Sequence, residues 1–263
     1  MVGILEAIFL GIVQGLTEWF PVSSSGHLAL FQNLFGWDVP VLFDIYLHLG
    51  TLLVLFVFFW DLIKDIFGDL VRMDFQTENS KLAGFILIGT VVTGAIGLIF
   101  HDAFSSMFTN MLYVGIAFIF TGIILVLSNK KRIVRKRLTL WDSIVIGFFQ
   151  GLALMPGVSR SGATIGVGLF RGLDKVKVAK FSFLMSIPAI IGATIIESFG
   201  VSEMAMPFLI ENFGVILTGV IFSAITGYVC LKLLMKLIEN GKFHYFAYYT
   251  FALGIVTILL SIA

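Results

Sequence analysis

The sequence predicts an all-α integral membrane protein with six transmembrane helices and two re-entrant helix-loop-helix pairs, arranged as an inverted-topology repeat. Three observations lead to this fold class. Hydrophobic residues make up 59% of the 263 residues and charged residues only 13%, whereas a soluble domain is about half apolar and a quarter charged. The chain contains six long apolar stretches, and one polar motif occurs twice at opposite ends of the sequence.

The apolar stretches set the number of transmembrane helices. A helix that crosses the bilayer needs about 20 predominantly apolar residues. Six stretches meet this requirement and are each expected to span the membrane once: roughly 41–61, 82–100, 110–128, 178–198, 212–237 and 244–262.

Two further apolar regions, 2–35 and 140–172, are each interrupted near the middle. The interruptions read "PVSSSGH" and "PGVSRSGAT". Proline removes a backbone donor and clashes with the preceding helical turn, so each region is predicted to form two short helices that enter the membrane and leave on the same side. One kinked span per region stays open as an alternative, because neighbouring helices can satisfy a kinked backbone.

The distribution of basic residues favours the re-entrant alternative. If both interrupted regions are re-entrant, 16 of the 17 Lys and Arg residues share one face of the membrane. They are Lys64, Arg72, Lys81, the six in "KKRIVRKR" at 130–137, Arg171, Lys175, Lys177, Lys180, Lys232, Lys236 and Lys242. By the positive-inside rule this face is cytoplasmic, and both termini and the first re-entrant loop face outside. The acidic residues between 61 and 78 are expected to belong to the same solvated face.

The interrupted regions also carry an internal repeat. Residues 11–26 read "GIVQGLTEWFPVSSSG" and residues 147–162 read "GFFQGLALMPGVSRSG", and eight of the sixteen positions are identical. Three spans lie between the copies, so the copies enter the membrane from opposite faces. Discontinuous helices related in this way meet near the midplane around a bound ligand. We therefore expect a single membrane domain, 1–263, with a first repeat of about 1–128, a second of about 140–263 and a basic cytoplasmic loop at 129–139.

Arg160 is the one basic residue outside the cytoplasmic face. An arginine at the centre of the membrane costs about 2.5–3.5 kcal/mol, which makes it a functional candidate by default. Each interruption ends in serines and a glycine before a new helix, so free N–H groups and a positive helix end face the gap. A guanidinium binds phosphate oxygens in pairs. These features predict an anion site, although a purely structural pairing of Arg160 with Glu18 stays open.

The two copies differ at the positions that carry chemistry. Glu18 and His27 occur only in the first copy, and Arg160 occurs only in the second. An acid, an imidazole, an arginine and hydroxyls are the parts of a phosphoryl-transfer site, in which a serine or a water attacks phosphorus. The predicted catalytic residues are Glu18, Ser24, His27 and Arg160. The predicted substrate-binding residues are Gln14, Ser23, Ser25, Gly26, Ser159, Arg160, Ser161 and Thr164.

A divalent cation, Mg²⁺ or Ca²⁺, is the expected cofactor. Mg²⁺ commonly takes only one or two carboxylates and completes its shell with substrate phosphates. Glu18 is therefore predicted as the metal ligand. Asp44 and His48, near the outer end of the first span, are weaker candidates for the border of the site, and His27 has the alternative role of a helix cap.

Two segments, "QGLTEWFPVSSSGHL" and "PGVSRSGAT", resemble the signature motifs of the undecaprenyl-diphosphate phosphatase family, which is also associated with bacitracin resistance. Motif order, spacing, length and hydrophobic profile are similar over essentially the whole chain. The resemblance implies six spans, two re-entrant helix pairs and a divalent cation. It also implies hydrolysis of the terminal phosphate of a long polyprenyl diphosphate, which recycles the lipid carrier of cell-envelope glycan synthesis.

The resemblance also implies roles for individual residues. The acidic motif falls on Gln14 and Glu18, and the serine-histidine element falls on Ser24 and His27. The arginine motif falls on Ser159, Arg160, Ser161 and Thr164. Because the first acidic position holds Gln14 rather than a glutamate, the expected metal-binding role rests on Glu18, and the choice between serine and histidine as nucleophile stays open.

The expected partners are a polyprenyl diphosphate and the plasma membrane, with no nucleic acid, and a homodimer stays open. The main alternative function is a transporter or flippase of polyprenyl phosphate or another anionic lipid, because inverted repeats are typical of transporters. The unequal copies favour catalysis over transport.

Overall fold

The computed structural model describes residues 2–129, 134–135, 137–200 and 202–262. Regular structure in these ranges is helical, apart from one bridge between Arg135 and Leu173. The first half contains α1 (Ile4–Trp19), α2 (Ser24–Phe35), α3 (Val41–Phe58), α4 (Trp60–Val71), α5 (Glu78–Ile99), α6 (His101–Met107) and α7 (Met111–Ser128). The second half contains α8 (Leu140–Leu152), α9 (Arg160–Phe170), α10 (Lys175–Gly200), α11 (Ser202–Glu211), α12 (Phe213–Glu239), the 3₁₀ turn η1 (Phe243–Tyr245) and α13 (Phe246–Ile262).

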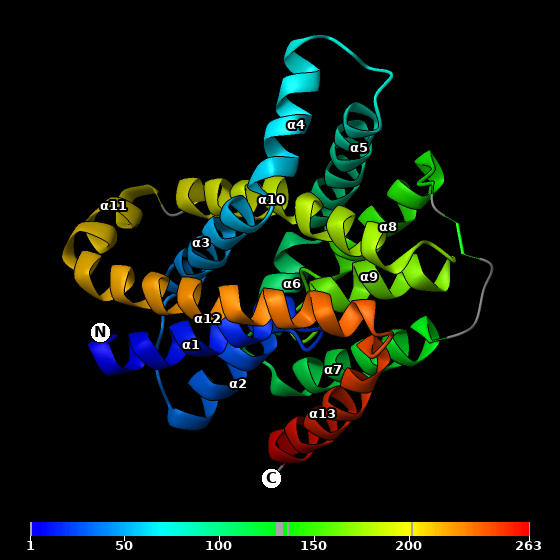
Figure 1. Cartoon of the computed structure of the whole chain (residues 1–263). Helices are drawn as coiled ribbons and strands as arrows, with labels where there is room; N and C mark the ends of the chain where they lie inside the picture. The colour runs from blue at the N-terminus through cyan, green and yellow to red at the C-terminus, as the bar shows by residue number, and fades with distance from the viewer. Residues whose placement is uncertain (1, 130–133, 136, 201, 263) are drawn as a thin grey trace.

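Six helical segments within the described ranges are long and apolar enough to cross a membrane, which confirms the predicted number. They are α3, α5, α7, residues Lys175–Ile196 of α10, α12, and η1 with α13. Each interrupted region forms two separate helices, α1 with α2 and α8 with α9. In Figure 1, α1 and α2 lie at the lower left and α8 and α9 at the right, while α4 and the adjoining end of α5 project beyond the other helices.

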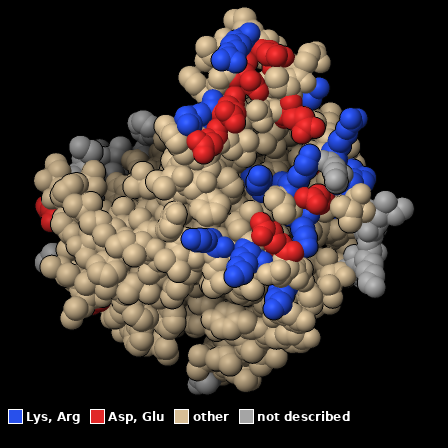
Figure 2. Space-filling view, viewed as in Figure 1, with Lys and Arg blue, Asp and Glu red and all other residues tan. Residues whose placement is uncertain are grey.

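Charged side chains on the visible face gather at the projecting α4 end and along the right-hand side of the molecule (Figure 2). The face over α11 and most of α12 carries almost none. The acidic segment that follows α3 is a helix rather than an irregular loop. In α4, Asp61 and Asp65 are exposed while Ile63 and Ile66 are half-buried, so the helix is amphipathic.

Glycines allow the short helices to pack backbone to backbone against long ones. α1 lies against α12, and α8 lies against α5. A Cβ on Gly11 would come 2.4 Å from the Gly219 carbonyl oxygen, and a Cβ on Gly147 would come 2.5 Å from that of Gly89. Small residues permit this close approach between membrane helices. The two halves therefore use equivalent glycines, Gly11 and Gly147, for equivalent contacts.

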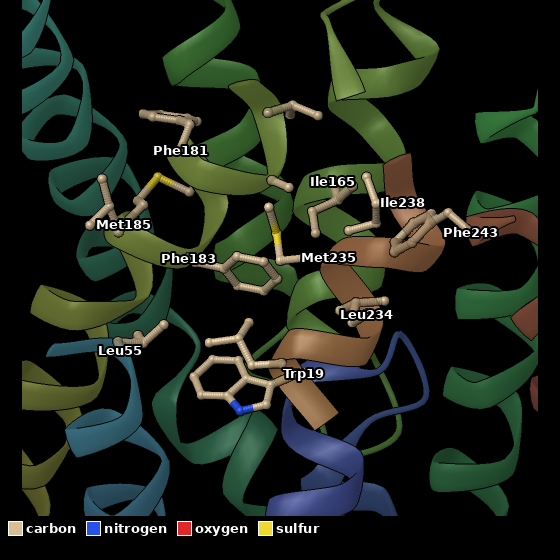
Figure 3. Packing of buried hydrophobic residues seen from close by; sticks show 14 of the residues in the cluster. Trp19, Leu55, Ile165, Phe181, Phe183, Met185, Leu234, Met235, Ile238 and Phe243 are labelled. Carbon is tan, nitrogen blue, oxygen red and sulfur yellow. The ribbon is translucent and has the colours of Figure 1, made fainter. Parts of the chain in front are cut away.

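The largest cluster of buried apolar side chains joins the end of α1 to helices of the second half (Figure 3). Trp19 is fully buried and meets Phe183 of α10 edge to face, with ring centroids 5.6 Å apart. Ile165 of α9 and Leu234 of α12 belong to the same cluster. A large aromatic side chain buries much apolar area, so this cluster holds the C-terminal end of α1 close to α9.

A buried carboxylate holds the start of α8. Asp142 is fully buried and accepts hydrogen bonds from Arg135 (3.0 and 3.1 Å), from Nε of Arg171 (2.7 Å) and from the Thr139 hydroxyl (2.7 Å). The backbone N–H of Arg135 also donates to the Gly172 carbonyl. Burial alone would raise the pKa of Asp142, but the hydrogen bonds from Arg135, Thr139 and Arg171 lower it far below the ordinary value.

Replacing this carboxylate should reduce stability in a pH-dependent way. Because the folded-state pKa is depressed, the carboxylate stabilises the fold above its unfolded pKa of about 4, and the contribution is lost as the pH falls further. Asp142→Asn should lower the free energy of unfolding by about 2 kcal/mol at pH 7 and approach the wild type below pH 4. Thermal unfolding in detergent measures this, with the exposed Asp65→Asn of α4 as the control; equal melting at pH 7 would contradict it.

Candidate active site

Both interruptions begin their second helix with a serine cap. Ser23 precedes α2 and its hydroxyl accepts the Gly26 N–H at 3.3 Å. Ser159 precedes α9 and its hydroxyl accepts the Gly162 N–H at 3.1 Å. In each case, other N–H groups of the first turn stay available for an anion.

The two interruptions touch each other. The Gly157 N–H of the second donates to the Ser23 hydroxyl of the first at 3.2 Å. A Cβ on Gly26 would come 2.8 Å from Cα of Gly157, so only glycine permits this contact. Two segments that are 134 residues apart in sequence therefore form one structural unit.

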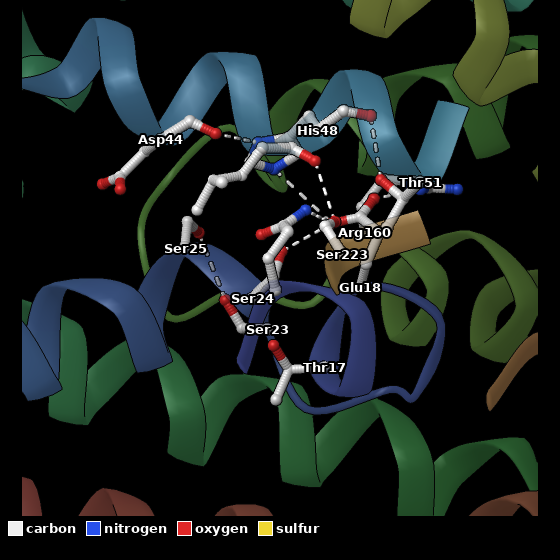
Figure 4. A network of polar contacts seen from close by, with 12 residues as sticks. Thr17, Glu18, Ser23, Ser24, Ser25, Asp44, His48, Thr51, Arg160 and Ser223 are labelled. Atoms are coloured by element: carbon white, nitrogen blue, oxygen red, sulfur yellow. Dashed lines mark hydrogen bonds and ion pairs between the residues drawn. The ribbon is translucent and has the colours of Figure 1, made fainter. Parts of the chain in front are cut away.

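Glu18 is the centre of the polar network at this junction (Figure 4). Its Oε1 accepts a hydrogen bond from Nη2 of Arg160. Its Oε2 accepts from the Ser24 hydroxyl at 2.6 Å and from Nε2 of Gln14 at 3.1 Å, and Nε2 of His48 lies 3.5 Å away. The side chains of Glu18 and Arg160 are only 6% and 15% exposed. The structure thus brings three predicted catalytic residues together: Glu18, Ser24 and Arg160.

Several buried polar atoms of this network lack a hydrogen-bond partner among the described residues. These include Nη1 of Arg160, Oε1 of Gln14 and Nε1 of Trp19. The Arg160 guanidinium also lies over the Trp19 ring, 5.5 Å from its centroid. An unpaired buried donor costs about 1–3 kcal/mol, and such groups call for an explanation. A bound anion would pair the free Nη1.

His48 is the imidazole that meets Glu18. Its Nδ1 donates to the Asp44 carbonyl at 2.8 Å, which directs Nε2 toward Glu18. The Asp44 carboxylate accepts both bonds from Nε2 of Gln32, at 2.8 and 2.9 Å. Sequence reasoning gave His48 little weight, and its position as an ionisable residue inside an apolar span was the only signal.

The His27 ring makes its hydrogen bonds with residues other than Glu18. Its Nδ1 donates to the Ser23 carbonyl at 2.7 Å and its Nε2 lies 2.8 Å from the Tyr249 hydroxyl. Both ring nitrogens are therefore engaged, and none of these contacts involves Glu18 or Arg160. The structure does not join His27 to the carboxylate network.

The remaining predicted residues fix the helix starts. The Ser23 and Ser25 hydroxyls are 3.3 Å apart, and so are those of Ser159 and Ser161. The Thr164 hydroxyl donates to the Arg160 carbonyl at 2.8 Å. These side chains hold the backbone that presents Ser24 and Arg160.

The described residues contain no group of three or more His, Cys, Asp or Glu side chains that could hold a metal ion. Gln14 lies one helical turn before Glu18 on α1, and its Nε2 faces Oε2 of Glu18, while its buried Oε1 has no partner among the described residues. A single carboxylate suits a hard cation only if phosphate or water oxygens complete its shell.

Comparison with known proteins gives a consistent result. Curated relatives named undecaprenyl-diphosphatase are 40% identical in Methanosphaera stadtmanae, covering 100% of this chain and 99% of the relative, and 39% identical in Halothermothrix orenii, covering 98% of both. A relative of the same name in Alkaliphilus metalliredigens is 42% identical, again over 98% of both chains. The family described as "Bacitracin resistance protein BacA" matches residues 7–256. With its six spanning helices and this match, the chain is an integral membrane protein that belongs to the bacitracin resistance protein BacA family.

Proposed function

We propose that this protein is an undecaprenyl-diphosphatase. It removes the terminal phosphate of a long-chain polyprenyl diphosphate, releases the monophosphate and inorganic phosphate, and so recycles the lipid carrier of cell-envelope glycan synthesis. The observation that carries the proposal is the half-buried Arg160, whose buried Nη1 has no partner among the described residues, together with a serine that is hydrogen-bonded to Glu18. The names of the relatives support the same substrate.

The phosphate oxygens bind at Arg160 and at the N-terminal ends of α2 and α9. Nη1 of Arg160 and the first-turn N–H groups neutralise the charge that develops on the phosphoryl group. Nη2 stays on Glu18, which keeps the guanidinium in place. The prenyl chain remains among the apolar helices and the lipid.

Ser24 supplies the nucleophile in this proposal. Its Oγ attacks the terminal phosphorus, and its proton passes to Oε2 of Glu18, 2.6 Å away. The bond from phosphorus to the bridging oxygen breaks and the monophosphate leaves. A water then hydrolyses the phosphoserine and releases phosphate, and direct attack by water at the same place gives the same products. An acid–base role for His27 stays a prediction from the sequence.

A divalent cation is part of this proposal. Glu18 would hold Mg²⁺ or Ca²⁺, with substrate phosphate oxygens as further ligands. The cation would supply positive charge to the diphosphate.

For the topology, we propose an inverted repeat of residues 1–128 and 140–263 with re-entrant α1–α2 and α8–α9 pairs. The equivalent glycine contacts, the equivalent serine caps and the contact between Ser23 and Gly157 support this arrangement. The basic residues lie on the cytoplasmic side, and both termini and the first interruption face outside. Because one chain supplies every residue of the site, a homodimer is not needed to complete it.

Loss of Arg160 should abolish most of the activity. We expect Arg160→Ala to reduce phosphate release from a polyprenyl diphosphate by roughly 10²–10³-fold, the usual cost of removing a donor to a developing oxyanion. Purified protein and a phosphate assay measure this, with Arg72→Ala on the exposed end of α4 as the matched control. Similar rates for Arg160→Ala and wild type would overturn the assignment, and lipid translocation without hydrolysis in liposomes would favour a flippase.

The proposed cation leads to a second prediction, which concerns metal dependence. Phosphate release should stop when a chelator removes divalent metal and should return with Mg²⁺ or Ca²⁺, because the phosphate charge then lacks its counter-ion. Mn²⁺ binding followed by electron paramagnetic resonance should weaken in Glu18→Gln and stay unchanged in Asp65→Asn. Activity that withstands chelation would exclude the cation from the reaction.

Cysteine labelling can test the proposed topology. The test uses a Cys230→Ala background, which removes the single native cysteine. Asp38 precedes α3 and Gln76 precedes α5, and both are exposed. A membrane-impermeant thiol reagent applied to intact cells should label Asp38→Cys, and should label Gln76→Cys only after permeabilisation. The reverse pattern would contradict the proposed orientation.

A further inference from the structure

Ser23 has a backbone conformation that serine rarely adopts. Its φ is +69°, in the left-handed region that disfavours residues with a Cβ. Such a conformation persists only where the surrounding structure holds it. Four hydrogen bonds hold Ser23: its hydroxyl accepts N–H groups of Gly26 and Gly157, and its carbonyl accepts both the backbone N–H (3.2 Å) and Nδ1 (2.7 Å) of His27.

The hydrogen bonds of His27 determine its tautomer. A carbonyl oxygen only accepts, so Nδ1 carries a proton and donates to the carbonyl of Ser23. In the neutral ring, Nε2 is then an acceptor, and the Tyr249 hydroxyl donates to it at 2.8 Å. The rings of His27 and Tyr249 are stacked at 5.7 Å with an interplanar angle of 4°, and Phe118 of α7 packs edge-on. His27 is buried, and no ion pair involves it among the described residues.

The second copy of the motif provides a comparison within the same chain. Ser159 is the counterpart of Ser23 and has an ordinary φ of −74°. Ala163 is the counterpart of His27, and it makes no side-chain hydrogen bond to hold the cap. The histidine is thus present in the copy whose serine is strained and absent from the copy whose serine is relaxed.

We propose that Tyr249 is a positioning residue for the phosphatase reaction. Through His27 it keeps Ser23 in its left-handed conformation, which joins Ser23 to Gly157 and places the adjacent Ser24 at Glu18. The proposal rests on the proposed function and assigns the first turn of α13, 222 residues from His27 in sequence, to the catalytic centre. In this proposal His27 supports the backbone of the loop at Ser23 and does not take part in proton transfer.

Three variants separate this role from acid–base chemistry at His27. Tyr249→Phe keeps the stacked ring and loses the donor, and should lower phosphate release by roughly 3- to 10-fold. Tyr248→Phe is the matched control, because Tyr248 is an exposed tyrosine like Tyr249 but its ring contacts Tyr245 rather than His27; it should match wild type. His27→Asn should retain at least tenfold more activity than His27→Ala, since an amide can still donate to the Ser23 carbonyl but cannot titrate.

The pH profile gives the decisive kinetic readout. If His27 only supports the loop, the His27→Asn enzyme should keep both limbs of the wild-type profile of activity against pH, at a reduced rate. With an acid–base role, His27→Asn and His27→Ala lose activity equally, by roughly 10²–10⁴-fold, and one limb disappears. That outcome, or a Tyr249→Phe enzyme that equals wild type, overturns the proposal.

A measurement without substrate separates failure of this proposal from failure of the proposed function. In ¹⁵N-histidine-labelled protein, which has four histidines, the signal absent from His27→Asn belongs to His27. It should show the neutral ring with the proton on Nδ1, and its Nε2 resonance should shift in Tyr249→Phe and not in Tyr248→Phe. A proton on Nε2, or no shift, overturns the contact even if the wild-type protein proves to be an active phosphatase. Absence of phosphate release by wild type would instead overturn the proposed function.

Discussion

The ion pair between Glu18 and Arg160 connects two helices that begin in different halves of the chain, 142 residues apart. Inside an apolar bundle each charge alone would be very costly, because burial removes its hydration. The carboxylate therefore needs all of its donors, and Ser24, Gln14 and His48 surround the oxygen that Arg160 leaves free. Nη1 of the guanidinium, in contrast, has no hydrogen-bond partner among the described residues. This nitrogen is therefore available to an oxygen of an anionic substrate.

The rest of the fold keeps this pair in place. Trp19 follows Glu18 and is anchored in the largest apolar cluster by Phe183. Gly26 and Gly157 allow the two interruptions to approach each other, and Ser23 links them by a hydrogen bond. Elsewhere in the fold, Asp142 links the start of α8 to Arg135. Rigid packing around a strained loop is a common basis for preorganised chemistry.

Much of the architecture followed from patterns that are local in sequence. Spanning helices are recognisable because hydrocarbon demands about 20 apolar residues in a row, and proline with serines marks the interruptions in both repeats. The helical form of α4 goes beyond the solvated acidic segment that the sequence predicts, because half-buried residues such as Ile63 and Ile66 give the helix an inner face. The pairing of Arg160 with Glu18 appeared among the alternatives, because intramembrane charges rarely stay single.

Local sequence patterns do not show which histidine, His27 or His48, lies beside Glu18. His27 belongs to the recognisable motif, and its residue type suggested a place beside Glu18. The direction of its ring depends on the left-handed Ser23 before it and on Tyr249, which comes from the last helix. His48 reaches Glu18 because α3 packs against α1. By itself the sequence determined the membrane class, the repeat and the set of polar residues, since these depend on composition and spacing. Tertiary structure alone decided which side chains meet, since this depends on how helices distant in sequence are rotated and packed against one another.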